Sequence, residues 1–230
     1  MKIHGLQKMT LLDYPGKVAC TVFLAGCDFR CPFCHNSELI GGDVEAVMDD
    51  DELLTFLKKR KGLLDGVAVT GGEPMLRPDL PELLTEIREL GYRIKCDTNG
   101  NHPDMLKHLV QAGLVDYVAM DIKNSPERYA ETIGLETFDM AKVNESIRFL
   151  LEGNVDYEFR TTVVKPLHDA ECFEGIGKLI KGAQRYYLQS FTDRDTVIFS
   201  GFSAPEPEEM IIYKNIVEPY VLKVSIRGQE

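Results

Sequence analysis

Three of the six cysteines in this sequence lie within eight consecutive positions, which is a spacing typical of a ligand-binding loop. Cys27, Cys31 and Cys34 form a C-x3-C-x2-C pattern, and Pro32 inside the triplet disfavours a continuous helix. We therefore expect a loop that wraps around its ligand. Three thiolates suit an iron-sulfur cluster, and a four-iron cluster with three protein ligands keeps one iron open for a substrate or cofactor.

A zinc site is the main alternative for this motif. Three cysteines and His35 would supply four tetrahedral ligands. Against zinc, Cys34 and His35 are adjacent, which makes convergence on one ion awkward, and the sequence has no second C-x2-C pair. The motif cysteines could also be buried thiols, which behave as small hydrophobes and are what we expect at Cys20, Cys96 and Cys172. The spacing favours the cluster over both alternatives.

A second group of chemistry-bearing residues follows an apolar strand pattern at residues 67–69. Gly71 and Gly72 end this pattern, and Glu73 and Pro74 come next. Glycines let the backbone approach a ligand closely, and a carboxylate beside them can accept hydrogen bonds from an ammonium group. Paired glycines also commonly mark a simple turn, which would leave Glu73 solvated. The cysteines upstream favour the ligand-binding interpretation.

The elements that must position these residues are short apolar runs that alternate with helical patterns. We predict strands at Lys17 to Leu24, Gly66 to Thr70, Arg93 to Thr98, Asp116 to Asp121, Tyr157 to Val164 and Arg185 to Gln189. We predict helices near Asp50 to Lys59, Leu80 to Leu90, Met105 to Ala112, Met140 to Leu151 and Glu171 to Ile180. This alternation indicates an α/β fold with parallel strands. Six β-α units are too few for a closed eight-stranded barrel, so we expect a partial, open parallel β/α barrel with its functional residues at the carboxyl ends of the strands.

Length and composition are those of one folded domain. The chain has 230 residues, of which 44% are hydrophobic and 27% charged, so we expect a single domain, 1–230, with a C-terminal extension at 205–230. That extension carries a short helix and a possible edge strand, Tyr220 to Ile226. The net charge of −11 argues against nucleic acid or an anionic membrane as the main partner. No apolar run is long enough to span a bilayer and the N-terminus does not match a signal peptide, so we expect a cytoplasmic protein.

The cysteine motif resembles that of the radical S-adenosylmethionine (radical SAM) superfamily, C-x3-C-x-aromatic-C, with Phe33 as the aromatic residue. The segment 71–74 resembles the GGEP motif of the same family. The resemblance implies that Cys27, Cys31 and Cys34 hold one 4Fe-4S cluster, whose open iron binds the amino and carboxylate groups of SAM. It also implies an enzyme that reductively cleaves SAM to a 5′-deoxyadenosyl radical, which abstracts hydrogen from a substrate.

Further segments resemble the activating enzymes of glycyl radical enzymes. They are Asp13-Tyr14-Pro15-Gly16, with Tyr14 as a departure from D-G-P-G, then Cys34-His35-Asn36, Asp97-Thr98-Asn99-Gly100, Met120-Asp121-Ile122-Lys123 and Arg160. The resemblance covers nearly the whole chain in one order. The variety that the chain most resembles is the anaerobic ribonucleoside-triphosphate reductase activating protein, in a longer form.

The resemblance implies contacts with SAM at the positions that match the family's motifs. These are Phe33 and His35 beside SAM, Gly71, Gly72 and Glu73 at its methionyl end, Asp97, Thr98 and Asp121 near its carboxylate, and Lys123 and Arg160 as further contacts. A monovalent cation would lie near Asp97 and Asp121.

Each of the polar residues also has a simpler interpretation. Asp97 and Asn99 could form a turn before a glycine. Asp121 and Lys123 could form an ion pair on one face of a strand, and Arg160 could be a solvated charge at the rim. We favour the functional interpretation because ligands bind at strand ends in this class of fold.

The implied function is that of a radical SAM activase, which forms a glycyl radical on a partner enzyme, the anaerobic ribonucleotide reductase. A glycine loop of that glycyl radical enzyme would have to enter the barrel mouth, because the reacting carbons must come within a few ångströms. A flavodoxin or ferredoxin-type reductant would reduce the cluster. The chain lacks a second cysteine-rich segment, so only one cluster is expected, and 189–192 stand where some activases carry a histidine near the adenosine.

Two other functions are weighed against this one. A radical SAM enzyme acting on a small molecule could resemble the 7-carboxy-7-deazaguanine synthases, but those tend to have D-T where this chain has His35-Asn36. A non-catalytic iron-sulfur or zinc protein would explain the cysteines and the net charge. It would leave the GGEP-like strand end and the DTNG-like turn as coincidences.

Overall fold

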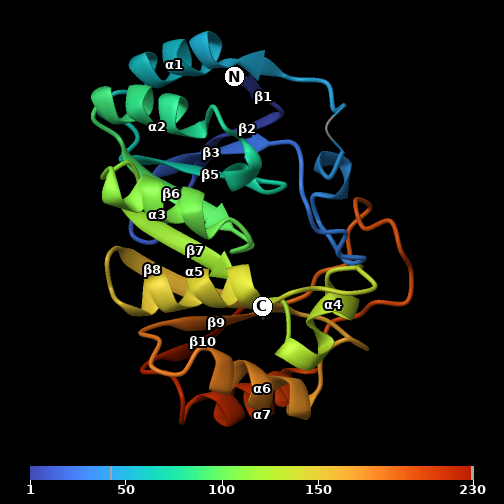
Figure 1. Ribbon diagram of the computed structural model, residues 1–230. Helices are drawn as coiled ribbons and strands as arrows, with labels where there is room; N and C mark the ends of the chain where they lie inside the picture. The colour runs from blue at the N-terminus through green and yellow to red at the C-terminus, as the bar shows by residue number, and fades with distance from the viewer. Residues whose placement is uncertain (42, 229–230) are drawn as a thin grey trace. The chain divides into compact units, whose positions relative to one another are not determined.

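The computed structural model describes residues 1–41 and 43–228 (Figure 1). The chain divides into two compact units. The first unit contains Met1–Asp28, Glu38–Thr98 and His102–Val118. The second contains Phe29–Ser37, Asn99–Asn101 and Ala119–Glu230. Strand β7 (Tyr117–Asp121) begins in the first unit and ends in the second. The cysteine motif is also divided, since Cys27 belongs to the first unit and Cys31 and Cys34 to the second.

The first unit is built on parallel strands with one antiparallel strand at the edge. The strands in spatial order are β2 (Gly5–Thr10), β3 (Ala19–Leu24), β5 (Gly66–Gly71) and β6 (Arg93–Thr98). β2 runs antiparallel to β3, whereas β3, β5 and β6 are parallel. The register pairs Leu24 with Gly71, so β3 and β5 end side by side. A separate short pair joins β1 (Lys2–Ile3) to β4 (Met48–Asp49).

The helices of the first unit are amphipathic and begin at favourable residues. They are α1 (Asp50–Lys59), α2 (Leu80–Glu89), α3 (Pro103–Gln111) and the short 3-10 helix η2 (Pro74–Leu76). Asp49 caps α1 by accepting a hydrogen bond from Glu52 N, and the Glu52 side chain caps Asp49 in return. In α2 the residues at spacings of three and four, Leu80, Leu83 and Ile87, are buried, which gives the helix one apolar face.

The second unit continues the parallel arrangement. Its strands include β8 (Asp156–Val163), β9 (Tyr186–Ser190) and β10 (Val224–Arg227), with β9 parallel to both neighbours. Its helices are α4 (Tyr129–Thr132), α5 (Ala141–Leu151), α6 (Ala170–Leu179) and α7 (Pro207–Val217), with the 3-10 helix η3 (Pro126–Arg128). A further 3-10 helix, η1 (Ser37–Leu39), follows the cysteine motif. α6 packs against α7, where the rings of Phe173 and Tyr213 stack at 4.5 Å.

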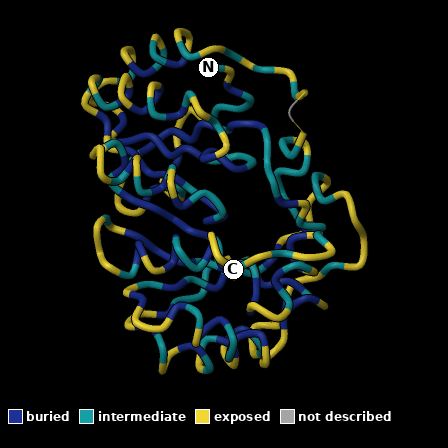
Figure 2. Tube along the Cα trace, viewed as in Figure 1, coloured by how far each residue is buried: buried dark blue, intermediate teal, exposed yellow. Residues whose placement is uncertain are grey.

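The strands form the core of each unit. Figure 2 shows buried backbone along them, and Val22, Val67 and Val69 have no exposed surface. Parallel strands that are covered on both faces are typically continuous apolar runs, and this explains why the sequence pattern located them. Among the described residues, no helix combines the length and the apolar character that crossing a bilayer requires.

The predicted fold class is confirmed. All six predicted strands and all five predicted helices are present with small shifts in their ends, and the C-terminal segment forms α7 and β10. β2 and β10 lie at the edges of their units, and each pairs with one neighbour among the described residues, so the strands do not close into a barrel. The sequence did not predict β2, because Gln7, Lys8 and Met9 are exposed in it and give no apolar alternation.

Candidate functional site

The residues that lead to Cys27 are held between two other segments of the first unit. On one side, Gly26 N donates to Leu39 O at 2.8 Å and Cys27 N donates to Ile40 O at 3.2 Å. On the other side, Glu73 N donates to Gly26 O at 2.7 Å. Backbone hydrogen bonds on both sides therefore fix the start of the cysteine loop without using any side chain.

The double glycine at the end of β5 is required by this packing. Gly71 has φ +122°, and a Cβ atom there would lie 2.3 Å from Leu24 O. A Cβ atom at Gly72 would lie 2.2 Å from Gly26 O. Real Cβ atoms do not approach a backbone oxygen this closely, so a side chain at Gly71 would require a shift of β3, and one at Gly72 a shift of the backbone that follows β3. The close approach that the sequence predicted is made to the backbone just before Cys27, and contact of these glycines with SAM stays a prediction.

Glu73 is buried, with 1% of its surface exposed, which excludes the solvated interpretation. Its Oε1 accepts hydrogen bonds from Met75 N at 3.0 Å and from Thr98 Oγ1 at 2.9 Å. The first bond caps η2 and the second joins the carboxyl end of β5 to that of β6. The structure thus brings together Gly71, Gly72, Glu73 and Thr98, as expected for the ends of adjacent parallel strands.

The turn after β6 has local partners. The Asp97 carboxylate accepts a hydrogen bond from Lys95 Nζ, and Lys95 is buried. Asn99 Oδ1 accepts from Asn101 N at 2.9 Å, which is the turn-forming role proposed as its simpler interpretation. In the second unit Ser146 Oγ also donates to Gly100 O at 2.7 Å. This turn is therefore well supported.

The segment with Cys31 and Cys34 is a tight turn in the second unit. Cys34 N donates to Cys31 O at 3.2 Å, and Arg30 N donates to Ile133 O at 2.8 Å. Gly134 lies so close that a Cβ atom there would be 2.3 Å from Arg30 O. The loop after α4 thus holds the backbone just before Cys31.

Phe29 anchors the same segment by its side chain. Its ring is 2% exposed and lies edge-on to Phe138, at 5.3 Å between centroids, and to Tyr129, at 6.5 Å. Such edge-to-face pairs stabilise by about 1 kcal/mol beyond simple burial. Sequence patterns do not predict this role for Phe29, because its partners lie about a hundred residues away in the chain.

Phe33 and His35 contact the segment that follows β9. Phe33 is buried with Val164, Leu167 and Phe191, and Cys31 packs against this cluster. The ring of His35 stacks on Phe191 at 5.3 Å, and its Nε2 lies 2.7 Å from Thr192 O. Burial lowers the pKa of His35, so its neutral form is favoured. The residues at 191 and 192 stand where some activases carry a histidine, and the structure gives them a role as support for the cysteine segment.

The strand-end residues of the second unit form an ion-paired group. Asp121 Oδ2 lies 2.8 Å from Lys123 Nζ, and Asp121 Oδ1 lies 2.5 Å from Arg160 Nε. Burial alone would raise the pKa of Asp121, but the charges of Arg160 and Lys123 outweigh it and hold the pKa well below its usual value. The predicted ion pair of Asp121 with Lys123 is present. Arg160 is part of it, so the interpretation as a solvated rim charge is wrong.

The thiols divide into two classes. Cys20, Cys96 and Cys172 are buried, as predicted, whereas Cys27, Cys31 and Cys34 are partly exposed and all six are free of disulfides. Burial raises the pKa of Cys31 to about 11, and the charge of Lys123 lowers it in part. Soft, partly accessible sulfur ligands in a supported loop fit an iron-sulfur cluster better than a set of core thiols.

A sequence model of the radical SAM superfamily matches residues 21–179, which include the cysteine motif and the strand ends described above. The chain belongs to this family. It is an enzyme of the radical SAM class, and membership implies a 4Fe-4S cluster and SAM.

Comparison with individual proteins agrees with this assignment. A protein of Methanocaldococcus jannaschii described as "Putative glycyl-radical enzyme activating enzyme" is 31% identical over 98% of this chain and 95% of its own length. A pyruvate formate-lyase-activating enzyme of Clostridium pasteurianum is 34% identical over 54% of this chain and 52% of its own. The crystal structure of Streptococcus suis SuiB bound to S-adenosylmethionine matches 90% of this chain and 52% of that one, with a TM-score of 0.68 and 14% identity, which shows the shared fold.

Proposed function

We propose that this enzyme activates a glycyl radical enzyme and that its partner is an anaerobic ribonucleotide reductase. The observation that carries the proposal is the similarity, over nearly the full length of both chains, to a described glycyl-radical enzyme activating enzyme. The choice of ribonucleotide reductase rests on the motif resemblance of the sequence. A cytoplasmic location and a flavodoxin or ferredoxin-type reductant belong to the same proposal.

Cys27, Cys31 and Cys34 would hold the cluster, and the chemistry of their thiols, none of which forms a disulfide, fits that role. Held by these cysteines, a reduced 4Fe-4S cluster would supply the one electron that reductive cleavage of SAM requires, and cleavage between sulfur and C5′ would give methionine and a 5′-deoxyadenosyl radical. Phe33 and its apolar neighbours pack against Cys31 and would shield that side of the cysteine segment from water. A glycine of the partner then gives up its α-hydrogen, and 5′-deoxyadenosine and a glycyl radical are the products.

The charged group of the second unit suits the carboxylate of SAM. One carboxylate, Asp121, is paired with two cations, Lys123 and Arg160, so the group carries an excess positive charge of one. Such an arrangement binds an anionic group through charge-assisted hydrogen bonds. Asp97 and Asp121 already have cationic partners, so a monovalent cation near them is supported by the family resemblance alone.

The experiment is an anaerobic assay of SAM cleavage. Wild type, Cys31→Ala and Cys20→Ala are reconstituted with iron and sulfide, reduced with dithionite and given SAM. Cys20 is a buried core thiol in β3, so Cys20→Ala is the matched control. We expect 5′-deoxyadenosine from wild type and the control and none from Cys31→Ala, whose cluster lacks a ligand. One zinc and no iron after anaerobic purification would instead favour a zinc protein.

The substrate is tested in parallel reactions. Purified anaerobic ribonucleotide reductase should acquire a glycyl radical, visible by electron paramagnetic resonance, when the reduced holoenzyme and SAM are added. The 7-carboxy-7-deazaguanine synthase-like function is tested with the small-molecule substrate of those enzymes. Turnover of SAM that modifies only the small molecule would contradict the proposed activase function.

A further inference from the structure

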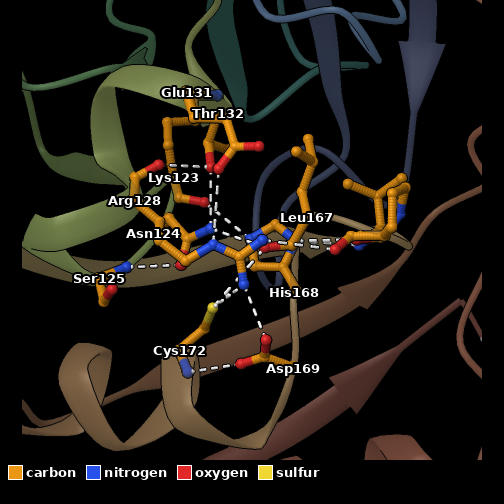
Figure 3. Close-up of polar contacts among 12 residues, drawn as sticks. Lys123, Asn124, Ser125, Arg128, Glu131, Thr132, Leu167, His168, Asp169 and Cys172 are labelled. Carbon is orange, nitrogen blue, oxygen red and sulfur yellow. Dashed lines mark hydrogen bonds and ion pairs between the residues drawn. The ribbon is translucent and has the colours of Figure 1, made fainter. Parts of the chain in front are cut away.

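His168 is a buried residue of the second unit that no sequence motif marks. It lies between β8 and α6 and is 3% exposed. Its Nε2 is 2.8 Å from the backbone oxygen of Lys123 (Figure 3). Its Nδ1 is 3.2 Å from both Val164 N and Val164 O, and Val164 O already accepts a hydrogen bond from His168 N at 3.0 Å. Both ring nitrogens therefore contact backbone groups, one of which belongs to the residue that pairs with Asp121.

These contacts fix the orientation of the ring. Burial lowers the pKa of His168, so the imidazole is neutral, with one nitrogen as donor and the other as acceptor. The arrangement that satisfies both contacts has Nε2–H donating to Lys123 O and Nδ1 accepting from Val164 N. A flipped or rotated ring would leave a buried polar group without its partner.

The ring also lies beside the aromatic residue of the cysteine segment. The centroids of His168 and Phe33 are 6.5 Å apart, and the two rings are nearly perpendicular at 77°. On its other side, His168 contacts Phe173 of α6 at 6.0 Å. One side chain thus contacts the aromatic residue of the cysteine motif and the backbone of Lys123.

The turn that carries His168 is held on both sides. Asn124 Nδ2 donates to Leu167 O at 3.0 Å, and the guanidinium of Arg128 donates to Asp169 Oδ2 at 2.8 Å (Figure 3). Asp169 in turn caps α6. Segments 123–128 and 167–169 are therefore joined by several contacts, and the bond from His168 Nε2 is the one made to the backbone of Lys123 itself.

We propose that His168 is a positioning residue, which holds the Lys123 backbone and the Phe33 ring in the arrangement that binds SAM. This rests on the proposed function, in which Lys123 binds the carboxylate of SAM, and on the family resemblance, which implies that Phe33 lies beside SAM. The alternative is that His168 is a satisfied core histidine, important for stability alone. The two differ in what a substitution that folds does to SAM binding.

The test compares His168→Asn with His168→Gln. The amide nitrogen of Gln can take the position of Nε2 and donate to Lys123 O, whereas Asn is too short. Tyr157→Phe is the control, because it removes a buried hydroxyl that accepts from Gln184 N elsewhere in the second unit. SAM is titrated into each reduced holoenzyme while the electron paramagnetic resonance signal of the cluster is followed, and KM and kcat for 5′-deoxyadenosine are measured alongside.

We expect His168→Asn to weaken SAM binding about tenfold and to raise KM by a similar factor, with kcat changed by no more than about twofold. His168→Gln should bind SAM within about threefold of wild type, and Tyr157→Phe should match wild type. If His168→Asn does not fold, His168→Met decides, because Met fills the space of the ring but cannot donate to Lys123 O: a tenfold loss of SAM affinity in the folded variant supports the proposal, and wild-type affinity overturns it.

Other outcomes also overturn it. Equal SAM affinity in folded His168→Asn and wild type would make His168 a core residue only. Weakened SAM binding in Tyr157→Phe would show that a loss of stability anywhere in the second unit is enough to lower SAM affinity. If the cluster signal of the wild-type enzyme does not respond to SAM, the proposed function and the role of His168 are both contradicted. If the wild-type signal responds and the variants bind SAM equally well, only the role of His168 is contradicted.

Discussion

The two units of this enzyme fix their strand-end residues by different means. In the first unit, neighbouring backbone atoms lie so close to Gly71 and Gly72 that only glycine fits at these positions. Glu73 is buried and accepts hydrogen bonds from Met75 N and Thr98 Oγ1. In the second unit, Asp121 is held by the charges of Lys123 and Arg160. The first arrangement depends on shape and the second on charge, so the two should respond differently to substitution and to pH.

The largest effect is expected from a side chain added at the double glycine. Gly72→Ala places a Cβ atom 2.2 Å from Gly26 O, and relief requires the backbone before Cys27 to move. We expect a loss of about 3 kcal/mol in the free energy of unfolding, measured with urea on the apoprotein. The loss should not change with pH, because no titrating group is involved.

Gly41→Ala is the control for this substitution, because a Cβ atom there meets nothing within 4 Å and the backbone conformation is ordinary. It should leave the free energy of unfolding within about 0.5 kcal/mol of wild type. If Gly72→Ala were as stable as Gly41→Ala, close backbone packing would not be what holds the strand ends of the first unit in place.

A smaller loss that does depend on pH is expected at Asp121. Asp121→Asn removes the partner of Lys123 and Arg160, and we expect the free energy of unfolding to fall by about 2 kcal/mol at pH 7. The pKa of Asp121 is lower in the folded chain, so its stabilisation is present above the unfolded pKa of about 3.9 and is lost as pH falls through the folded pKa. The difference between variant and wild type should therefore persist at pH 5 and shrink only in stronger acid.

Asp156→Asn provides the comparison on the surface. Asp156 pairs with Arg185 at 3.3 Å, but its side chain is 74% exposed, and exposed ion pairs stabilise little. The free energy of unfolding of Asp156→Asn, measured with urea, should differ little from that of wild type at pH 7 and at pH 5. A pH-independent loss in Asp121→Asn would mean that packing rather than charge holds the strand ends of the second unit.

The same contrast explains what the sequence could predict. The strands β3, β5 and β6 are apolar runs, and the cysteine and GGEP motifs are local, so family, fold class and the first unit's strand ends followed from neighbouring residues. β2 was missed because an exposed edge strand with polar residues lacks the alternation that marks a half-buried strand.

Contacts between distant residues were not predictable in this way. The partner of His35 is a backbone oxygen 157 positions along the chain, and the ring partner of Phe29 at 138 belongs to a loop without a motif. His168 likewise has no neighbouring signal, and its contact with Lys123 spans 45 positions. Side chains of this kind are placed by tertiary packing, which local propensity does not encode. The SAM-binding roles of the site residues stay predictions that the experiments above address.

The smallest effect is expected where the segment after β9 supports the cysteine motif. His35→Phe keeps a ring to stack on Phe191 but removes the contact of Nε2 with Thr192 O. Losing one hydrogen bond of about 1 kcal/mol should raise the open fraction of this segment about fivefold. Trypsin cleavage after the exposed Arg194 should accelerate by that factor, while the melting temperature falls by no more than about 2 °C.

His108→Phe, at an exposed histidine of α3, is the control and should leave cleavage after Arg194 unchanged. Equal cleavage rates in His35→Phe and wild type would show that stacking alone holds the segment. A large fall in melting temperature would show instead that the contact stabilises the whole second unit. In that case shape, and not only charge, would fix the second unit as it does the first, and the contrast between the two would be confined to Asp121 and its partners.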